Sequence, residues 1–237
     1  MIATRTGSTW ERSPWLAGIV FVVALVTETA ISGALPINQD DSATKIATEL
    51  DAHTTLILVV ASICVVYAAA FPIYLWKLYD LLRADDDRSR TLAVVILVGG
   101  ALMIVLHVTS DVGIYGMLGA KLASYSVHHD PGISYTLYLT TFAIDSVGDI
   151  FGSLFLLAAG VLALRNGLLP RWLAWVALVA AVFLFLQGFG LGGVIATFGL
   201  VLDLIGFLLF LLFVLASSVI GLRRENAAPA SVTPSST

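Results

Sequence analysis

The sequence predicts an all-α protein, a polytopic membrane bundle of six transmembrane helices with both termini on the cytoplasmic side. Three observations predict this class. Hydrophobic residues make up 59% of the 237 residues and charged residues only 12%, whereas about a quarter of a soluble domain is charged. The apolar residues gather in long continuous runs, each close to the roughly 20 residues that cross a bilayer as a helix. The basic residues also flank these runs on one side.

The apolar runs are residues 15–35, 55–78, 92–118, 135–164, 172–189 and 194–222. The second and third runs are joined by a basic turn, and the fifth begins with Trp172 and Trp175 beside Arg171, which are typical interfacial anchors. The glycine-rich residues 187–193 predict a tight turn or a close approach of helices before the last run. No period-two alternation interrupts the runs, so they predict helices.

The basic residues predict the orientation. All of the 12 Lys and Arg residues except Lys45 and Lys121 lie before the first run, from the end of the second (Lys77) to the third, between the fourth and fifth, or after the sixth. Because basic residues are retained on the cytoplasmic side, we expect a multi-pass protein of the plasma (inner) membrane. Its segments are a cytoplasmic N-terminal segment 1–14, a six-helix transmembrane domain 15–222 and a disordered cytoplasmic tail 223–237.

The N-terminal region has one alternative interpretation. Arg5 and Arg12, the apolar run from Trp15 and the small residues around Gly33 also resemble a cleavable signal peptide. We favour a retained helix because the apolar character resumes after Glu28 and the full run is long enough to span. Cleavage would leave five helices in the same orientation.

Composition also excludes some classes of partner and site. The net charge of −4 and the pI near 5.4 argue against nucleic-acid binding. A single Cys excludes a disulfide framework and a thiolate metal cage. The predicted outer loops, 36–54 and 119–134, are too short for separate domains. The lipid bilayer is the expected partner, beside a homo-oligomer or another membrane protein.

Ionisable residues inside the predicted spans carry the functional information. They are Glu28, His107, Asp111, Asp145, Asp149 and Asp203. Each charged residue at a helix centre costs about 2.5–3.5 kcal/mol on an insertion scale, and such residues usually face a bundle interior or a wet cavity. We therefore expect them to lie inside the bundle.

Spacing and depth predict that these side chains meet. His107, Asp111 and Tyr115 recur at i, i+4 and i+8, and so share one helix face. Asp145 and Asp149 repeat the pattern on the fourth span, where the small residues Gly148 and Gly152 allow a neighbouring helix to approach. At about 1.5 Å per residue, all six ionisable residues fall near the midplane or in its outer half, together with Ser62, Cys64, Tyr67 and Gln187. This predicts one polar cluster that opens outward.

The charge balance of this cluster favours a cation or exchangeable protons. No Lys or Arg lies at hydrocarbon depth, so His107 is the one internal cationic partner for five acids. The candidate ion- or proton-binding residues are therefore Glu28, His107, Asp111, Asp145, Asp149 and Asp203. If a metal binds, His107, Asp111, Asp145 and Asp149 are its candidate ligands, and their oxygen-rich chemistry suits a hard divalent cation. No other cofactor is expected.

Three functions remain open at this stage. The favoured one is binding or transport of a cation or a proton-coupled small solute. The acids could instead be protonated and hydrogen-bond neighbouring helices, as in a structural or accessory subunit. A metal-dependent intramembrane lipid hydrolase is less favoured, because zinc hydrolases usually use several His ligands and no hydrolase motif is present.

The junction between the fourth and fifth spans resembles a connection found in a known family of membrane proteins. Its sequence, from Leu164 to Leu173, is LRNGLLPRWL. It is similar to the connection found in uncharacterised bacterial six-helix integral membrane proteins, a family of unknown function. These also have a Glu in the first helix, here Glu28, and a Leu- and Arg-rich inner turn after the second helix. The resemblance implies a six-helix protein, and it implies no catalytic residue.

Overall fold

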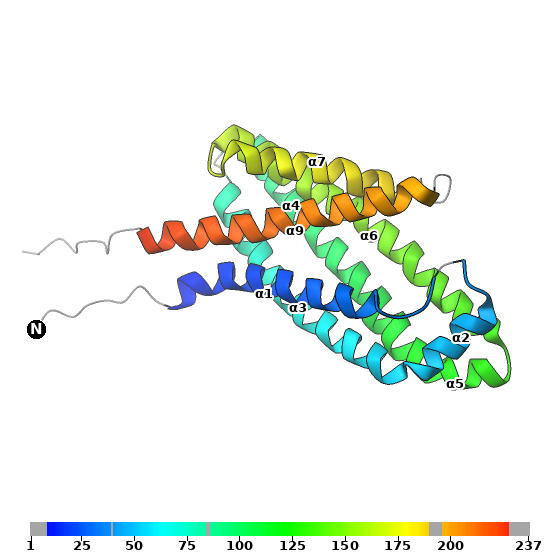
Figure 1. Cartoon of the computed structure of the whole chain (residues 1–237). Helices are drawn as coiled ribbons and strands as arrows, with labels where there is room; N and C mark the ends of the chain where they lie inside the picture. Colours follow the sequence, from blue (N-terminus) through cyan, green and yellow to red (C-terminus); the bar gives the residue numbers. More distant parts are fainter. Residues whose placement is uncertain (1–8, 39, 84–85, 190–195, 228–237) are drawn as a thin grey trace, which may run out of the picture.

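Long helices joined by short turns run the length of the molecule (Figure 1). The computed structural model describes residues 9–38, 40–83, 86–189 and 196–227, without the side chains of residues 9–13, 196–200 and 203. The elements are α1 (Thr9–Ser32), α2 (Ala43–Ala52), α3 (Thr54–Leu82), α4 (Asp87–Val108), the π-helix η1 (Thr109–Gly119), α5 (Ala120–His128), α6 (Pro131–Asn166), α7 (Arg171–Gly188) and α9 (Ala196–Ala227). The described residues contain no strand.

The predicted all-α class with six membrane-spanning helices is confirmed. In the described part of the chain, six helical stretches are long and apolar enough to cross a membrane. Five of them lie in α1, α3, α6, α7 and α9. The third is a continuous stretch of 42 residues made of α4, η1 and α5.

These helices form a closed ring. Along the ring, α1 packs against α3, α3 against α4, α4 against α6, α6 against α7, α7 against α9, and α9 back against α1. Aromatic side chains fill one half of its interior. The ring centroid of Phe71 lies 5.9 Å from those of Tyr74 and Phe155, and the ring centroid of Phe21 lies 5.8 Å from that of Phe210. This half of the ring is a densely packed core.

Local sequence signals explain where several helices begin and end. Asp86 accepts a hydrogen bond from the backbone N–H of Ser89 and caps α4. Asp130 caps α6 in the same way, with Pro131 at the first helical position, where its missing N–H costs nothing. Gly167 ends α6 with a φ of 62°, a left-handed conformation that favours glycine. The turn to α7 therefore needs only a few residues.

Two short helices occupy segments that the sequence predicted to be outer loops. Helix α2 begins after Ser42, whose side chain accepts from the N–H of Lys45, and it buries Ile46 and Leu50. Together with α5 it covers a second, smaller core that includes Ile57 and Tyr138. Both helices have one apolar face, but with ten and nine residues they are too short to cross a membrane, so a prediction based on long apolar runs missed both.

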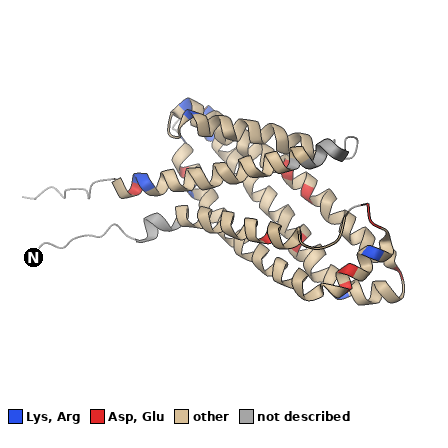
Figure 2. Cartoon of the chain, in the orientation of Figure 1, with Lys and Arg blue, Asp and Glu red and all other residues tan. Residues whose placement is uncertain are grey.

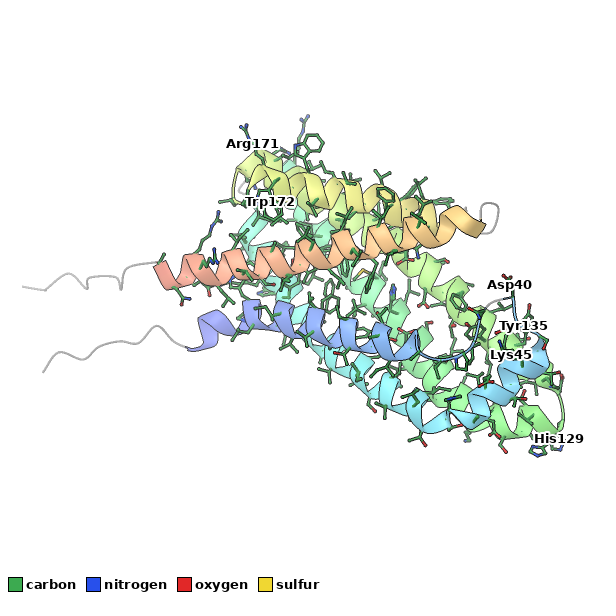
Figure 3. The ribbon with its side chains drawn as sticks, in the orientation of Figure 1. Asp40, Lys45, His129, Tyr135, Arg171 and Trp172 are labelled. Carbon is green, nitrogen blue, oxygen red and sulfur yellow. The ribbon has the colours of Figure 1, made fainter. Side chains whose placement is uncertain are left out.

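The charged residues mark the two ends of the ring. Figure 2 shows basic residues near both ends and acidic residues also within the helices. Arg171 and Trp172 lie at one end, and Lys45 and His129 lie at the opposite end beside α2 and α5 (Figure 3). Helix α9 continues to Ala227, past the predicted end of the last span. Arg5 and residues 190–193 of the predicted glycine-rich turn lie outside the described residues.

Candidate functional site

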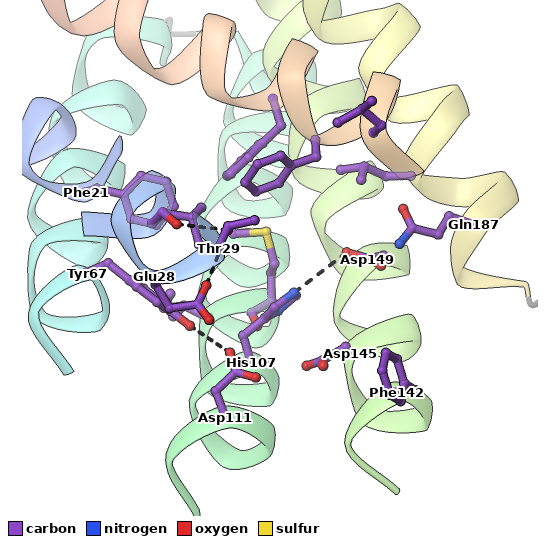
Figure 4. A pocket seen from close by; sticks show the side chains of 17 residues that line it. Phe21, Glu28, Thr29, Tyr67, His107, Asp111, Phe142, Asp145, Asp149 and Gln187 are labelled. Carbon is purple, nitrogen blue, oxygen red and sulfur yellow. Dashed lines mark hydrogen bonds and ion pairs between the residues drawn. The ribbon is translucent and has the colours of Figure 1, made fainter. Parts of the chain in front are cut away.

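A cavity of about 540 Å³ lies inside the ring (Figure 4). Side chains from every membrane-spanning stretch line it. Phe21 and Phe210 line it where it borders the aromatic core, so packed rings close the cavity on that side. Near the C-terminal end of α1, Thr29 is exposed, and Leu204 on α9 is 56% exposed. The cavity therefore reaches the surface between α1 and α9.

The ionisable residues predicted to meet do surround this cavity. Those lining it are Glu28 on α1, His107 on α4, Asp111 on η1, and Asp145 and Asp149 on α6. Asp203 falls within α9, but its side chain lies outside the described part of the chain. No Lys or Arg lines the cavity among the described residues. The wall therefore carries four carboxyl groups and a single group that can become positive.

His107 is held by two neighbours. Its Nδ1 lies 2.9 Å from the carbonyl oxygen of Met103. Because a carbonyl oxygen can only accept, Nδ1 carries a proton and donates this bond. Its Nε2 lies 3.7 Å from Oδ1 of Asp149 (Figure 4). This arrangement leaves Nε2 directed toward the carboxylate, ready to pair with it when the ring is protonated.

Gly148 fixes the position of the His107 ring from the other side. A Cβ at this position would lie 2.7 Å from both Cε1 and Nδ1 of the ring. One turn further along α6, a Cβ at Gly152 would lie 2.9 Å from the sulfur of Met103. The two glycines predicted to permit close approach therefore admit α4, and with it the imidazole.

Asp111 is anchored on η1. Its Oδ2 accepts a 2.9 Å hydrogen bond from the hydroxyl of Tyr67 on α3 (Figure 4). The neighbouring Ser110 donates to the carbonyl oxygen of Thr141 on α6, at 3.2 Å. Tyr115, predicted to share the face of His107 and Asp111, does not line the cavity and packs 6.2 Å from the ring of Tyr138. The wider π-helical turn carries this position off the stripe that an α-helix would form.

Glu28 lies at the α1 side of the cavity. Its Oε1 accepts a 2.6 Å hydrogen bond from the hydroxyl of Ser32, one turn further along the helix. Its Oε2 lies 3.3 Å from the hydroxyl of Thr29 (Figure 4). Both hydrogen-bond partners belong to its own helix, and no ion pair within 4 Å involves Glu28 in the described part of the chain.

Two oxygen atoms of the cavity residues have no described partner. Oδ1 of Asp145 and Oε1 of Gln187 are buried, and neither makes a hydrogen bond with the described residues. An amide oxygen can only accept, and so can an ionised carboxylate. Leaving such an acceptor buried and unsatisfied costs about 1–3 kcal/mol. Both side chains line the cavity, but these two oxygen atoms are themselves shielded from it.

The proposed metal ligands do not form a metal centre in the described part of the chain. No three His, Cys, Asp or Glu side chains there converge closely enough to hold one ion. His107 and Asp149 approach each other, and Asp111 is held by Tyr67 instead. The site is a wide acidic cavity, which is a different arrangement from the compact ligand shell of a bound divalent ion.

Sequence reasoning missed the aromatic part of the wall. Phe142, Phe207 and Phe210 line the cavity, but a phenylalanine in an apolar run gives no signal of which way it faces. Ser62 and Cys64, predicted to lie at the level of the cluster, do not line the cavity. Ser62 is exposed and donates to the carbonyl oxygen of Leu58, and Cys64 is fully buried in the core.

The fold and the cavity together define a class: a multi-pass helical membrane protein with an acidic, partly aromatic cavity between its helices. Residues 16–221 match the family described as Domain of unknown function (DUF4386). The chain belongs to this family, in agreement with the predicted resemblance to an uncharacterised family. No curated protein and no solved structure matches the chain significantly.

Proposed function

We propose that the cavity binds a cation or a proton-coupled small solute, and that the protein binds or transports it at the plasma membrane. The observation that supports this proposal is the set of ionisable side chains in the cavity wall. It has four carboxyl groups, one imidazole and no Lys or Arg among the described residues. Ionised carboxyl groups held close together in a medium of low dielectric repel one another, so a bound cation stabilises them.

The orientation supports access from outside. The predicted cytoplasmic end carries Arg171 (Figure 3), and the opposite end carries α2 and α5 (Figure 1). With the basic end retained inside, both termini are cytoplasmic and α2 and α5 lie on the outer face. The aromatic core then closes the cavity toward the inside. Transport therefore requires a rearrangement of this core, whereas binding from outside does not.

Thermal unfolding of the purified full-length protein in detergent tests the proposal. We expect the wild type to show a saturable rise in Tm with at least one cation from a panel of sodium, magnesium, calcium and organic ammonium ions. The midpoint of thermal unfolding, Tm, rises when a ligand binds only the folded state. The Asp145→Asn/Asp149→Asn variant should lose this rise.

The control is Asp80→Asn, which makes the same change outside the cavity, at a side chain that pairs with Arg83 and is 48% exposed. It should keep the full cation response. Equal responses of all three proteins to every cation would overturn the proposed site and leave helix packing as the explanation of the acids.

A further inference from the structure

The cavity is much larger than an inorganic cation requires. Its volume of about 540 Å³ lies within the roughly 300–1,000 Å³ typical of sites for small organic molecules. Magnesium and calcium are instead coordinated at about 2.0–2.6 Å by several oxygen atoms. The described residues offer no such group of ligands. Size and donor arrangement therefore favour an organic occupant.

The rest of the wall suits a positively charged group attached to an apolar body. Phe21, Phe142, Phe207 and Phe210 line the cavity beside the carboxyl groups. Aromatic faces attract cations and also bury apolar surface. A neutral apolar ligand would pack against the rings and leave the carboxyl groups uncompensated, whereas an inorganic ion would leave the apolar surface of the rings uncovered.

The two unpartnered oxygen atoms specify the polar group. Oδ1 of Asp145 and Oε1 of Gln187 are buried acceptors that lack a donor among the described residues. An ammonium group with N–H bonds supplies such donors, and a charge-assisted bond to a carboxylate is roughly twice as strong as a neutral one. A quaternary ammonium ion has the charge but no N–H to donate.

We propose that the occupant of this cavity is a hydrophobic organic amine, bound as its ammonium ion. Rotation about the terminal side-chain bond of Asp145 and of Gln187 turns an oxygen of each toward the cavity, where the N–H groups of the amine donate to them. Its apolar body packs against the phenylalanine rings. This inference rests on the proposed cation site and names the class of cation.

Four probes test it with the purified full-length protein at neutral pH. They are diphenylpropylamine, the alcohol diphenylpropanol, the quaternary trimethyl(diphenylpropyl)ammonium ion, and magnesium chloride. The amine at about a hundredfold excess over its Kd should raise Tm by about 5 °C or more. The alcohol and magnesium should raise Tm by less than about 1 °C, because the alcohol has no positive charge and magnesium has no apolar body. The quaternary ion should bind at least about fivefold more weakly than the amine, because it cannot donate.

Variants locate the amine. Asp145→Asn should lower its affinity by about tenfold or more, since a charge-assisted hydrogen bond is lost. Gln187→Met, which keeps the side-chain volume and removes the acceptor, should lower it by about threefold or more, and it provides the test if Asp145→Asn fails to fold. Asp80→Asn should bind the amine like the wild type.

The outcomes separate this inference from the proposed function. Stabilisation by magnesium, calcium or sodium without stabilisation by the amine would overturn the amine and leave the cation site standing. Equal binding of the amine and the alcohol would show that the positive charge is not recognised. Unchanged amine affinity in both the Asp145→Asn and the Gln187→Met variants would show that the ammonium group does not bind at these residues. No response to any cation would overturn both proposals.

Discussion

Among the described residues that line the cavity, His107 is the one that can carry a positive charge. Its side chain is 27% exposed, and its ring is fixed between the Met103 carbonyl oxygen and the backbone of Gly148. A fixed ring keeps Nε2 directed at Asp149 instead of allowing it to rotate toward other acids. A protonated His107 would offset one carboxylate and leave the others for a bound cation.

Replacing Gly148 with Ala should displace this ring. The added Cβ would meet the imidazole at 2.7 Å, so either the ring or helix α4 must shift, at a cost of about 1–3 kcal/mol. We expect a lower Tm and an affinity for the bound cation weakened by about threefold or more, measured by thermal unfolding and ligand titration.

Gly113→Ala is the matched control for this substitution. A Cβ at Gly113 has no neighbour within 4 Å, and alanine is favoured over glycine in a helix. Its Tm should equal or exceed that of the wild type. Equal cation affinity in the Gly148→Ala variant would show that the position of the ring is unimportant for binding.

At the scale of single elements, the start of α4 carries a pH-sensitive contact outside the membrane. The hydroxyl and backbone N–H of Ser89 both donate to Asp86, with Arg165 3.6 Å away. These bonds, chiefly that from the Ser89 hydroxyl, hold the pKa of Asp86 below its ordinary value of 3.8. The ionised form is therefore favoured in the folded protein.

Asp86→Asn should reveal this contact as a pH-dependent difference in stability. Because the folded-state pKa is lowered, the contribution of the charge is complete at neutral pH, above the unfolded pKa. It is lost as the pH falls below 3.8 through the folded pKa. The variant should unfold at a lower Tm than the wild type at pH 7, and the two midpoints should converge in acid. A constant difference across the pH series would contradict this assignment, because asparagine also caps helices well.

The contact between α1 and α9 depends on a glycine in each helix. A Cβ at Gly18 would collide with the hydroxyl of Ser218 and lie 2.7 Å from Cδ2 of Tyr74, and Gly221 lies against the ring of Trp15. Trp15 also donates to Glu225 at 3.1 Å, and Glu225 pairs with Lys77 at 2.9 Å. These contacts hold together the end of the ring that lies opposite α2 and α5.

Gly18→Leu should open this contact. A larger side chain in a packed interface costs about 1–3 kcal/mol, so we expect a clearly lower Tm in thermal unfolding. Val20→Leu enlarges a side chain of the same helix that is 46% exposed, and it should leave Tm nearly unchanged. Similar losses in both variants would mean that α1 tolerates no enlargement on either face, and would remove the special role of Gly18.

For the whole molecule, the orientation follows from the basic residues and has a direct test. Cys64 is fully buried, so a membrane-impermeant maleimide should not label the folded wild type. Ser124 on α5 and Arg88 on α4 are both exposed and lie in the predicted outer and inner regions. In intact cells, Ser124→Cys should react at once and Arg88→Cys only after permeabilisation. The reverse pattern would invert the proposed topology.

The helical class was predictable because the bilayer imposes a strong constraint. A chain in hydrocarbon must satisfy its backbone hydrogen bonds internally, so long apolar runs become helices wherever they occur, and α3 and α6 cover their predicted runs. The short helices α2 and α5 were missed, because their stability depends on burying Ile46 and Ala123 against the rest of the fold. Local propensity alone does not stabilise helices of nine or ten residues.

The sequence by itself determined which ionisable residues had to leave the lipid, since a charge there is expensive whatever the fold. It also indicated that Glu28, His107 and the acids of α6 lie at similar depth. Only the tertiary structure decided that they share a cavity with Phe142 and Phe207, that η1 turns Tyr115 away, and that Asp145 keeps an unpartnered oxygen. The physical reason is that depth follows from counting residues along one helix, whereas the direction of a side chain in an apolar run depends on which helices pack against it.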